Sequence, residues 1–225
     1  MQVTLRTKVA AAVVGAALAA PAAASAEVIE VGKTLPAATP SCPKSCLALS
    51  RTTGYQTRVD NVTGLTRIPA NGRIVAWTVS LGKPGKKQIS FFNSKLGGVS
   101  QAQISVLRTG KHYKARTVAV GEIQRLEPFF GTTVQFPLAQ SLPVRKNYVI
   151  ALRVPTWIPA MANGSDTTTW RASRGRGTCE DTATQTAQST GQLATYWCFY
   201  KTAQLTYSAT LVTNPVPPPQ PKKKT

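Results

Sequence analysis

Histidine and carboxylate side chains, on which most hydrolytic active sites depend, are scarce in this sequence. Its 225 residues include a single histidine, His112, in the basic segment Thr109–Lys114 between two expected strands. A serine hydrolase needs a histidine beside its nucleophile, and the chain contains no Gly-x-Ser-x-Gly motif. Metal catalysis through several histidines is excluded as well. We therefore expect His112 to be a surface residue.

Only eight acidic residues are present, which limits glycoside cleavage by paired carboxylates. Glu122 and Glu127 are the closest candidate pair in the expected core. They are five positions apart, so they have opposite strand parity, and Pro128 follows the second of them. We expect them to form ion pairs with cations such as Arg125. A polysaccharide hydrolase that uses this pair remains an alternative hypothesis.

Dense groups of metal ligands are also missing. Asp60 with Asn61, and Asn163 with Asp166, place too few oxygen ligands together for a calcium loop. We expect no metal, no cofactor and no catalytic residue.

Long hydrophobic runs are absent except near the beginning. Arg6 and Lys8 precede the apolar segment Val9–Ala20, and small residues, Ala24 to Ala26, follow it. This pattern predicts a signal peptide over residues 1–26, cleaved after Ala26. A helix that stays in the membrane as an anchor would need about 20 apolar residues, which is more than this segment contains. We therefore expect export, with no transmembrane span after cleavage.

The chain is strongly basic, with 27 Lys and Arg and a formal charge of +19. The first 26 residues carry two of the basic residues and none of the acidic ones, so the remainder keeps +17. Such a charge attracts polyanions. Because the cations are scattered, a basic exported protein without a polyanion partner is an equal alternative.

Four cysteines in an exported chain predict two disulfides. Three pairings are possible, and we favour the local one, Cys42 with Cys46 and Cys179 with Cys198. A four-cysteine zinc site is disfavoured, since the second pair is too widely spaced and export favours oxidation.

Alternation of apolar and polar residues predicts many short strands. It begins in Val28–Val31, is clearest in Ile74–Leu81, and recurs later in the chain. The later segments are 102–106, 118–120, 134–138, 148–154, 193–199 and 205–211. Gly and Pro separate them, and no window outside the first 26 residues has a convincing helical period. We predict an all-β fold: a two-sheet antiparallel sandwich of jelly-roll type.

We expect one domain over residues 27–213, because the remaining chain suits one core and the strands are regularly spaced. Residues 214–225, with five prolines and three consecutive lysines, predict a disordered tail. A cationic spacer facing an anionic envelope is the functional alternative for this tail.

Three segments of the middle of the chain carry a family resemblance. They are 68–79 (IPANGRIVAWTV), 104–108 (ISVLR) and 142–152 (LPVRKNYVIAL). Over residues 60–160 the chain resembles uncharacterised secreted β-sandwich proteins of high-GC bacteria. The resemblance implies fold and location, and transfers no catalytic residue.

Aromatic residues near arginines give the candidate binding site. Trp77 and Trp197 share the apolar phase of their strands, so we expect both in the core. The candidate ligand-binding residues are Trp157, Trp170, Arg171, Arg174 and Arg176. An exposed tryptophan can stack on a sugar ring, and arginines can bind carboxylate, sulfate or phosphate groups.

A structural alternative exists for the same residues. Trp157 with Ile158 and Met161 could close one end of the sandwich, and the arginine segment could be a solvated loop. Specific nucleic-acid binding is not expected, because no dense basic stripe or oligonucleotide-binding signature is present.

These observations favour a secreted, non-enzymatic β-sandwich, monomeric and in contact with the cell wall. Its expected partner is an anionic cell-envelope polymer or an acidic polysaccharide. The other hypotheses are the carboxylate hydrolase and a purely structural surface protein.

Overall fold

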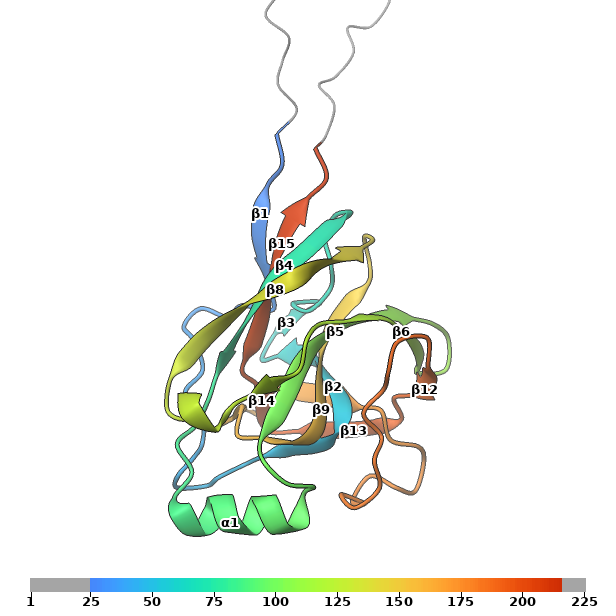
Figure 1. The fold of residues 1–225 in the computed structure, drawn as a ribbon. Coiled ribbons are helices and arrows are strands. Elements are labelled where there is room, and N and C mark those ends of the chain that lie inside the picture. Colours follow the sequence, from blue (N-terminus) through green and yellow to red (C-terminus); the bar gives the residue numbers. More distant parts are fainter. Residues whose placement is uncertain (1–24, 216–225) are drawn as a thin grey trace, which may run out of the picture.

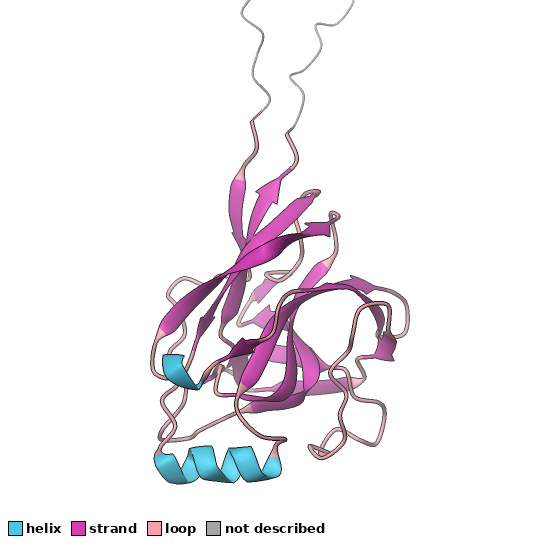
Figure 2. Cartoon of the chain, viewed as in Figure 1, coloured by secondary structure: helices cyan, strands magenta, loops and turns pink. Residues whose placement is uncertain are grey.

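The computed structural model describes residues 25–215, which form a mostly β structure with antiparallel sheets and one short α-helix (Figures 1 and 2). The predicted signal peptide up to residue 24, and the predicted tail from residue 216, lie outside the described residues. Within residues 25–215, no helix combines the length and the apolar character needed to cross a membrane.

The smaller sheet has four antiparallel strands in the order β1-β15-β4-β8. Their bounds are β1 Val28–Val31, β15 Tyr207–Thr213, β4 Gly72–Ser80 and β8 Thr133–Val144. Trp77 and Val79 of β4 are fully buried, as their alternation predicts. The edge strand β8 contains Pro137 and Pro143, which cannot donate a ladder hydrogen bond and are tolerated at an edge.

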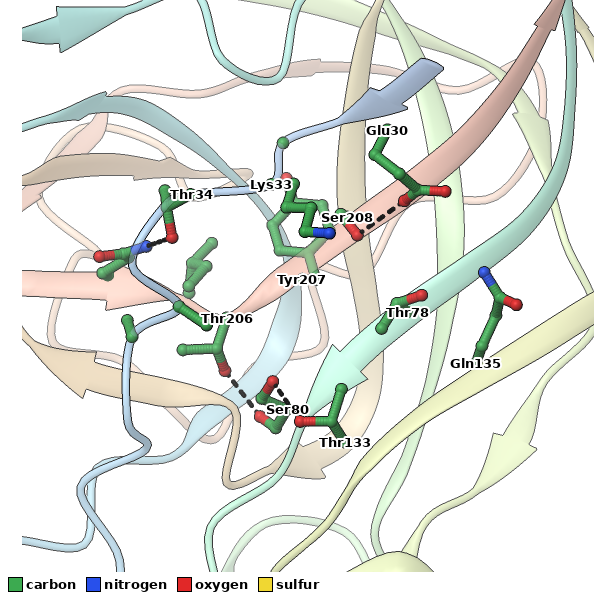
Figure 3. A pocket seen from close by; sticks show the side chains of 15 residues that line it. Glu30, Lys33, Thr34, Thr78, Ser80, Thr133, Gln135, Thr206, Tyr207 and Ser208 are labelled. Atoms are coloured by element: carbon green, nitrogen blue, oxygen red, sulfur yellow. Dashed lines mark hydrogen bonds between the residues drawn. The ribbon is translucent and has the colours of Figure 1, made fainter. Parts of the chain in front are cut away.

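The outer face of this sheet is polar. Thr78 and Ser80 of β4 and Ser208 of β15 line a hollow there, beside the segment that follows β1 (Figure 3).

The larger sheet has nine strands and is strongly curled into a half-barrel. Its main path runs β12-β6-β5-β9-β2-β11-β13, with β3 paired to β2 and β7 paired to β5. The bounds are β12 Leu193–Thr195, β6 Lys114–Val120, β5 Gln101–Thr109, β9 Val149–Ile158, β2 Leu49–Val59, β11 Thr169–Ala172, β13 Cys198–Lys201, β3 Val62–Thr63 and β7 Gln124–Arg125. The two outermost strands, β12 and β13, are separated in the chain only by Tyr196 and Trp197. The curl therefore brings the two ends of this path together.

The remaining elements are short. They are β10 Met161–Asn163 paired with β14 Ala203–Leu205, α1 Lys86–Lys95 and the 3-10 helix η1 Glu127–Phe129.

Two clusters of buried apolar side chains stabilise the structure. The larger includes Trp77 of the four-stranded sheet and Ile104 of the curled sheet. The smaller is formed by Leu107, Ala115, Val149, Ala151 and Tyr196. Burying a side chain of this size contributes about 1.5–3 kcal/mol. Tyr196 lies in the link between β12 and β13, so this link contributes a buried residue to the core of the curled sheet.

Both predicted disulfide pairings are confirmed. Cys42 is bonded to Cys46 in the segment before β2, and Cys179 is bonded to Cys198 at the start of β13. The described chain has no free cysteine, so the zinc alternative is wrong there.

The alternating segments form strands as expected, with two exceptions. The predicted strand 193–199 is divided at Tyr196–Trp197, and its halves, β12 and β13, belong to different ends of the curled sheet. The segment 205–211 is likewise divided at Thr206, between β14 and β15.

Candidate functional site

Trp157 is buried, so the expectation that it is an exposed ligand-binding residue is wrong. It belongs to β9, where its indole Nε1 donates to Asn93 Oδ1 at 2.8 Å and to the carbonyl of Gly98 at 3.0 Å. The rings of Phe92 and Phe130 lie 4.7 and 5.5 Å from its ring. Because α1 supplies Phe92 and Asn93, an element that the sequence did not predict covers this tryptophan. Ile158 and Met161 are buried too, in agreement with the alternative of apolar packing.

Trp170 is also buried, which corrects its predicted exposure. It lies in β11 and stacks on Tyr200 of β13, with ring centroids 4.3 Å apart and planes 16° from parallel. Its register partner in β2 is Gln56. A buried ring in this position stabilises the sheet and cannot stack on a ligand from solvent.

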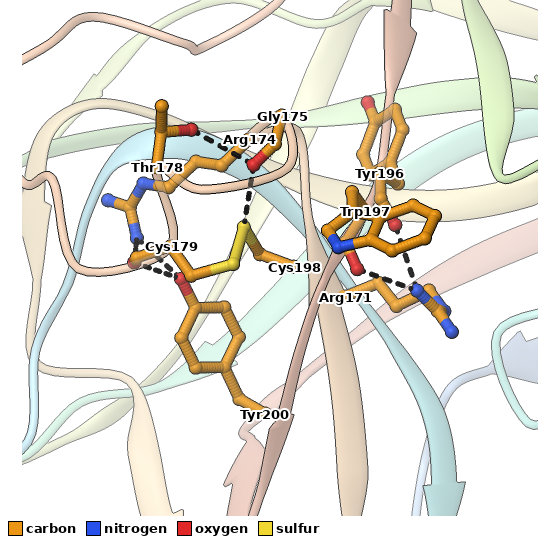
Figure 4. The surroundings of a disulfide bond; sticks show 9 residues. All are labelled: Arg171, Arg174, Gly175, Thr178, Cys179, Tyr196, Trp197, Cys198 and Tyr200. Carbon is orange, nitrogen blue, oxygen red and sulfur yellow. Dashed lines mark hydrogen bonds between the residues drawn. A yellow bond between two sulfur atoms is a disulfide. The ribbon is translucent and has the colours of Figure 1, made fainter.

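Arg174 is the third predicted site residue that is buried, with 4% of its surface exposed. Its guanidinium donates to the Tyr200 hydroxyl at 3.0 Å and the Cys179 carbonyl at 3.4 Å (Figure 4). It also donates to the Ser50 carbonyl at 2.8 Å. The Arg174 carbonyl in turn accepts the N–H of Trp197 at 3.1 Å. Arg174 therefore fixes the loop around the second disulfide and is not itself a surface contact.

The other two predicted arginines lie at the surface among exposed aromatic rings. The Arg171 guanidinium carbon is 4.0 Å from the centroid of Tyr113 and 4.9 Å from that of Phe199, and the same atom of Arg176 is 5.4 Å from Trp197. Tyr113 and Trp197 meet edge to face at 5.6 Å. We call these five residues the aromatic–arginine surface.

The expectation that Trp197 lies in the core is also wrong, because this residue is 40% exposed. Phe199 and Tyr113 are 45% and 48% exposed. The sequence did contain a signal for Trp197 and Phe199. Cys198 lies between them and is fully buried in its disulfide. In an extended chain the two neighbours of an inward residue point outward.

Strand register and backbone bonds assemble this surface. Arg171 of β11 is directly paired with Phe199 of β13 and, on its other side, with Tyr55 of β2. The N–H of Tyr196 donates to the Tyr113 carbonyl at 2.8 Å, which joins the turn before β6 to the link between β12 and β13. The rings and the guanidinium are therefore placed by backbone bonds.

The Arg171 guanidinium is oriented by two further bonds. Nη1 donates to the carbonyls of Tyr196 and Trp197, each at 3.0 Å. Nε and Nη2 take part in neither bond, and a planar guanidinium can use such a pair of donors to bind one carboxylate, sulfate or phosphate group.

Phe199 also borders a hollow of about 550 Å³. Thr57, Arg58, Thr63, Asp166, Thr167, Thr169 and Lys201 complete its lining. Lys201 and Arg58 are both register partners of Thr169, on opposite sides of β11. The hollow thus combines an aromatic wall, hydroxyl groups and two cations with one carboxylate.

Asp181, in the same loop as Arg176, is held by its own turn. The Thr184 hydroxyl and the backbone N–H groups of Thr184 and Ala183 donate to its carboxylate and hold the pKa of Asp181 below its ordinary value of 3.8.

Glu122 and Glu127, the pair considered for glycoside cleavage, have partners on different elements. Glu122 accepts the N–H of Gln140 in β8 at 3.3 Å, whereas Glu127 accepts the side-chain amide of Asn93 in α1 at 3.0 Å. Neither residue lines either hollow. This placement gives the hydrolase hypothesis no support.

His112 is exposed, as predicted. Among residues 25–215, no three His, Cys, Asp or Glu side chains lie together as a metal site would need.

Fold and surface together define a disulfide-linked, mostly β protein with a cationic aromatic surface. None of the family models, curated proteins or solved structures compared with the chain matches it.

Proposed function

We propose that this protein is a non-enzymatic binding protein whose aromatic–arginine surface holds an anionic cell-envelope polymer or an acidic polysaccharide. The observation that carries the proposal is the place of Arg171 between the exposed rings of Tyr113 and Phe199. Aromatic faces suit the apolar side of a sugar ring, and the oriented guanidinium suits its acidic substituent. The formal charge of the chain, +19, increases the rate of encounter with such a polymer.

Export to the outside of the cell, with association with the cell wall, is part of the proposal. Two disulfides support it, because disulfides persist mainly in oxidising compartments.

A jelly-roll sandwich is the fold we propose for the strand framework. Four nested antiparallel pairs support this classification: β1 with β15, β2 with β9, β4 with β8, and β5 with β6. When these eight strands are counted in chain order, the pairs join the first to the last, the second to the seventh, the third to the sixth and the fourth to the fifth. In this description, residues 161–205 are an insertion between β9 and β15, and most of the aromatic–arginine surface lies on it.

Retention on an immobilised polyanion tests the proposed function. The probe is polygalacturonate, a carboxylated polysaccharide, and the bound protein is eluted with a sodium chloride gradient. The double variant Arg171→Gln/Arg176→Gln should elute at much lower salt than the wild type. Each lost charge-assisted hydrogen bond is worth about 1.5 kcal/mol, or about tenfold in affinity.

The matched control is Arg125→Gln/Arg145→Gln, which removes the same charge from exposed arginines outside the surface. It should elute close to the wild type. Equal shifts for the two double variants would mean that net charge alone retains the protein. No retention of the wild type at low salt would overturn the proposal.

A third variant tests the aromatic contribution. Trp197→Ala leaves the charge unchanged and should still weaken retention, because it removes a ring that stacks on sugar. Circular dichroism of each variant checks that the sheets are intact.

A further inference from the structure

The outer face of the four-stranded sheet carries a hollow of about 340 Å³, apart from the surface described above (Figure 3). The volume falls within the range of about 300–1,000 Å³ that is usual for small-molecule sites.

Hydroxyl groups dominate the lining of this hollow. They come from Thr34, Thr78, Ser80, Thr133, Thr206 and Ser208. The four strand residues among them follow from period-2 alternation: Thr78 is paired with Ser208 across β4 and β15, and Ser80 with Thr133 across β4 and β8. The amides of Gln135 and Gln204 add to these groups. Thr206 and Ser208 already donate to the Ser80 carbonyl and to Glu30, so toward a ligand their hydroxyls act as acceptors. The Thr78 hydroxyl and the second amide hydrogens of Gln135 and Gln204 can donate, so the hollow can match a ligand that both donates and accepts.

The wall formed by the segment after β1 is fixed to the rest of the molecule. The Gly32 N–H donates to the Leu65 carbonyl at 2.8 Å, and the Gln204 amide donates to Thr34 Oγ1 at 3.0 Å. Gly32 has a φ of +87°, and a Cβ there would lie 3.1 Å from the Tyr207 carbonyl oxygen. A glycine is needed because the segment passes so close to β15. The hollow is therefore formed before any ligand arrives.

Its charge differs from that of the molecule as a whole. Among the described residues that line the hollow, one is acidic, Glu30, and one is basic, Lys33, so their charges balance. Glu30 accepts hydrogen bonds from the hydroxyls of Ser208 and Thr210. A carboxylate at this place repels anions, and it also accepts well from the hydroxyls of an uncharged ligand.

Stacking contributes little here. Tyr207, the aromatic residue of the lining, is 5% exposed, and its hydroxyl donates to the Ile150 carbonyl at 3.0 Å. Recognition therefore depends on hydrogen bonds.

We propose that this hollow binds an uncharged oligosaccharide through hydrogen bonds from its hydroxyl and amide side chains. Many hydroxyl groups and no net charge are the ligand properties that such a lining matches. The inference is independent of the polyanion proposal, because the two sites share no residue and favour ligands of different charge.

Nuclear magnetic resonance of the ¹⁵N-labelled chain tests it. The probes are cellotetraose, maltotetraose, laminaritetraose and mannotetraose, each added to about 10 mM, which detects dissociation constants into the millimolar range. At least one should shift the backbone amides of Thr78, Ser80 and Gln135 and leave the indole N–H of Trp197 in place. Tetragalacturonate should do the reverse if the polyanion proposal holds, so the two proposals succeed or fail separately.

Two variants confirm the location. Thr78→Val/Thr133→Val removes two hydroxyls while keeping β-branched side chains, and it should weaken binding at least tenfold; Ala37→Trp fills the hollow and should abolish it. Thr109→Val, at the exposed end of β5, is the matched control and should bind as the wild type does. If no neutral probe shifts these amides, or if shifts survive both variants, the inference is overturned.

Discussion

Arg171, Arg174 and Arg176 are close in sequence and have three different roles. Arg171 is half-buried between two rings, Arg174 is buried among oxygen acceptors, and Arg176 is exposed beside Trp197. A buried guanidinium is costly to remove from water, and the carbonyl and hydroxyl oxygens that accept from Nη1 and Nη2 of Arg174 offset part of that cost, while its buried Nε has no partner. At the residue scale, we therefore expect replacement of each of these three arginines to affect stability and binding differently.

Replacing Arg174 should destabilise the fold. Arg174→Ala leaves the buried Ser50 carbonyl without this donor, which costs about 1–3 kcal/mol. It also removes the charge-assisted bond to the Tyr200 hydroxyl, which keeps the Cys179 carbonyl as its own acceptor. We expect the free energy of unfolding to fall by about 3 kcal/mol. Urea unfolding followed by circular dichroism measures it.

Arg176→Ala is the control, because exposed substitutions usually stay within about 0.5 kcal/mol. Equal losses for the two variants would contradict the separation of roles.

At the scale of elements, strands with apolar alternation were predictable and strands with buried hydroxyls were not. The alternation in Ile74–Leu81 predicted β4, Gly72–Ser80, because one face of this strand is apolar. In contrast, β2 buries Ser50, Thr52, Thr53 and Gln56, so its pattern is not apolar. Its buried groups are satisfied by distant residues, as when the Thr53 N–H donates to Ser173 Oγ at 2.9 Å. Such partners are not visible in sequence.

The sequence pattern did not predict the helix α1, for a related reason. None of its ten residues is fully buried, so no apolar stripe marks it. It nevertheless covers Trp157. This missed helix, together with the continuation of β9 to Ile158 beyond the predicted segment 148–154, explains why Trp157 was placed wrongly in the site.

The candidate site was predictable only in part. Arg171 and Arg176 were found from composition and spacing. Trp197 was assigned to the wrong face because the predicted strand continued through Tyr196, where the chain in fact crosses between the two ends of the curled sheet. Tyr113 joins the site through long-range pairing that local patterns do not encode.

Two adjacent phenylalanines of α1 provide a test of its role. Phe92 lies 4.7 Å from the Trp157 ring, whereas Phe91 is 57% exposed. Phe92→Ala should lower the free energy of unfolding by about 2 kcal/mol, less than the 3–5 kcal/mol of a fully buried phenylalanine. It should also increase acrylamide quenching of tryptophan fluorescence, because acrylamide gains access to the Trp157 ring.

Phe91→Ala should change stability by less than about 0.5 kcal/mol. If the two variants behave alike, α1 does not seal this part of the core.

At the scale of the whole molecule, the two candidate sites lie on different sheets. The hydroxyl-lined hollow lies on the outer face of the four-stranded sheet, and the aromatic–arginine surface lies where the curled sheet brings its ends together. Both described ends of the chain leave from the β1–β15 pair, away from α1 (Figure 1).

The excess of positive charge should make stability depend on salt. With 27 basic and eight acidic residues, most cations have no carboxylate to pair with, and their repulsion opposes the compact state. Raising sodium chloride from about 10 to about 150 mM shortens the screening length from about 30 to about 8 Å. We expect this to add about 1 kcal/mol of stability, which raises Tm by about 2–4 °C for a chain of this size. Calorimetry at pH 7 measures the change.

The variant Arg125→Glu/Arg145→Glu lowers the net charge by four outside both candidate sites, so its Tm should be higher at low salt and less sensitive to added salt. A Tm that stays constant or falls with salt in the wild type would show that repulsion among the cations does not limit the stability of the fold. In that case the scattered cations lie too far apart to act on one another strongly, and capture of a polyanion would depend mainly on the aromatic–arginine surface.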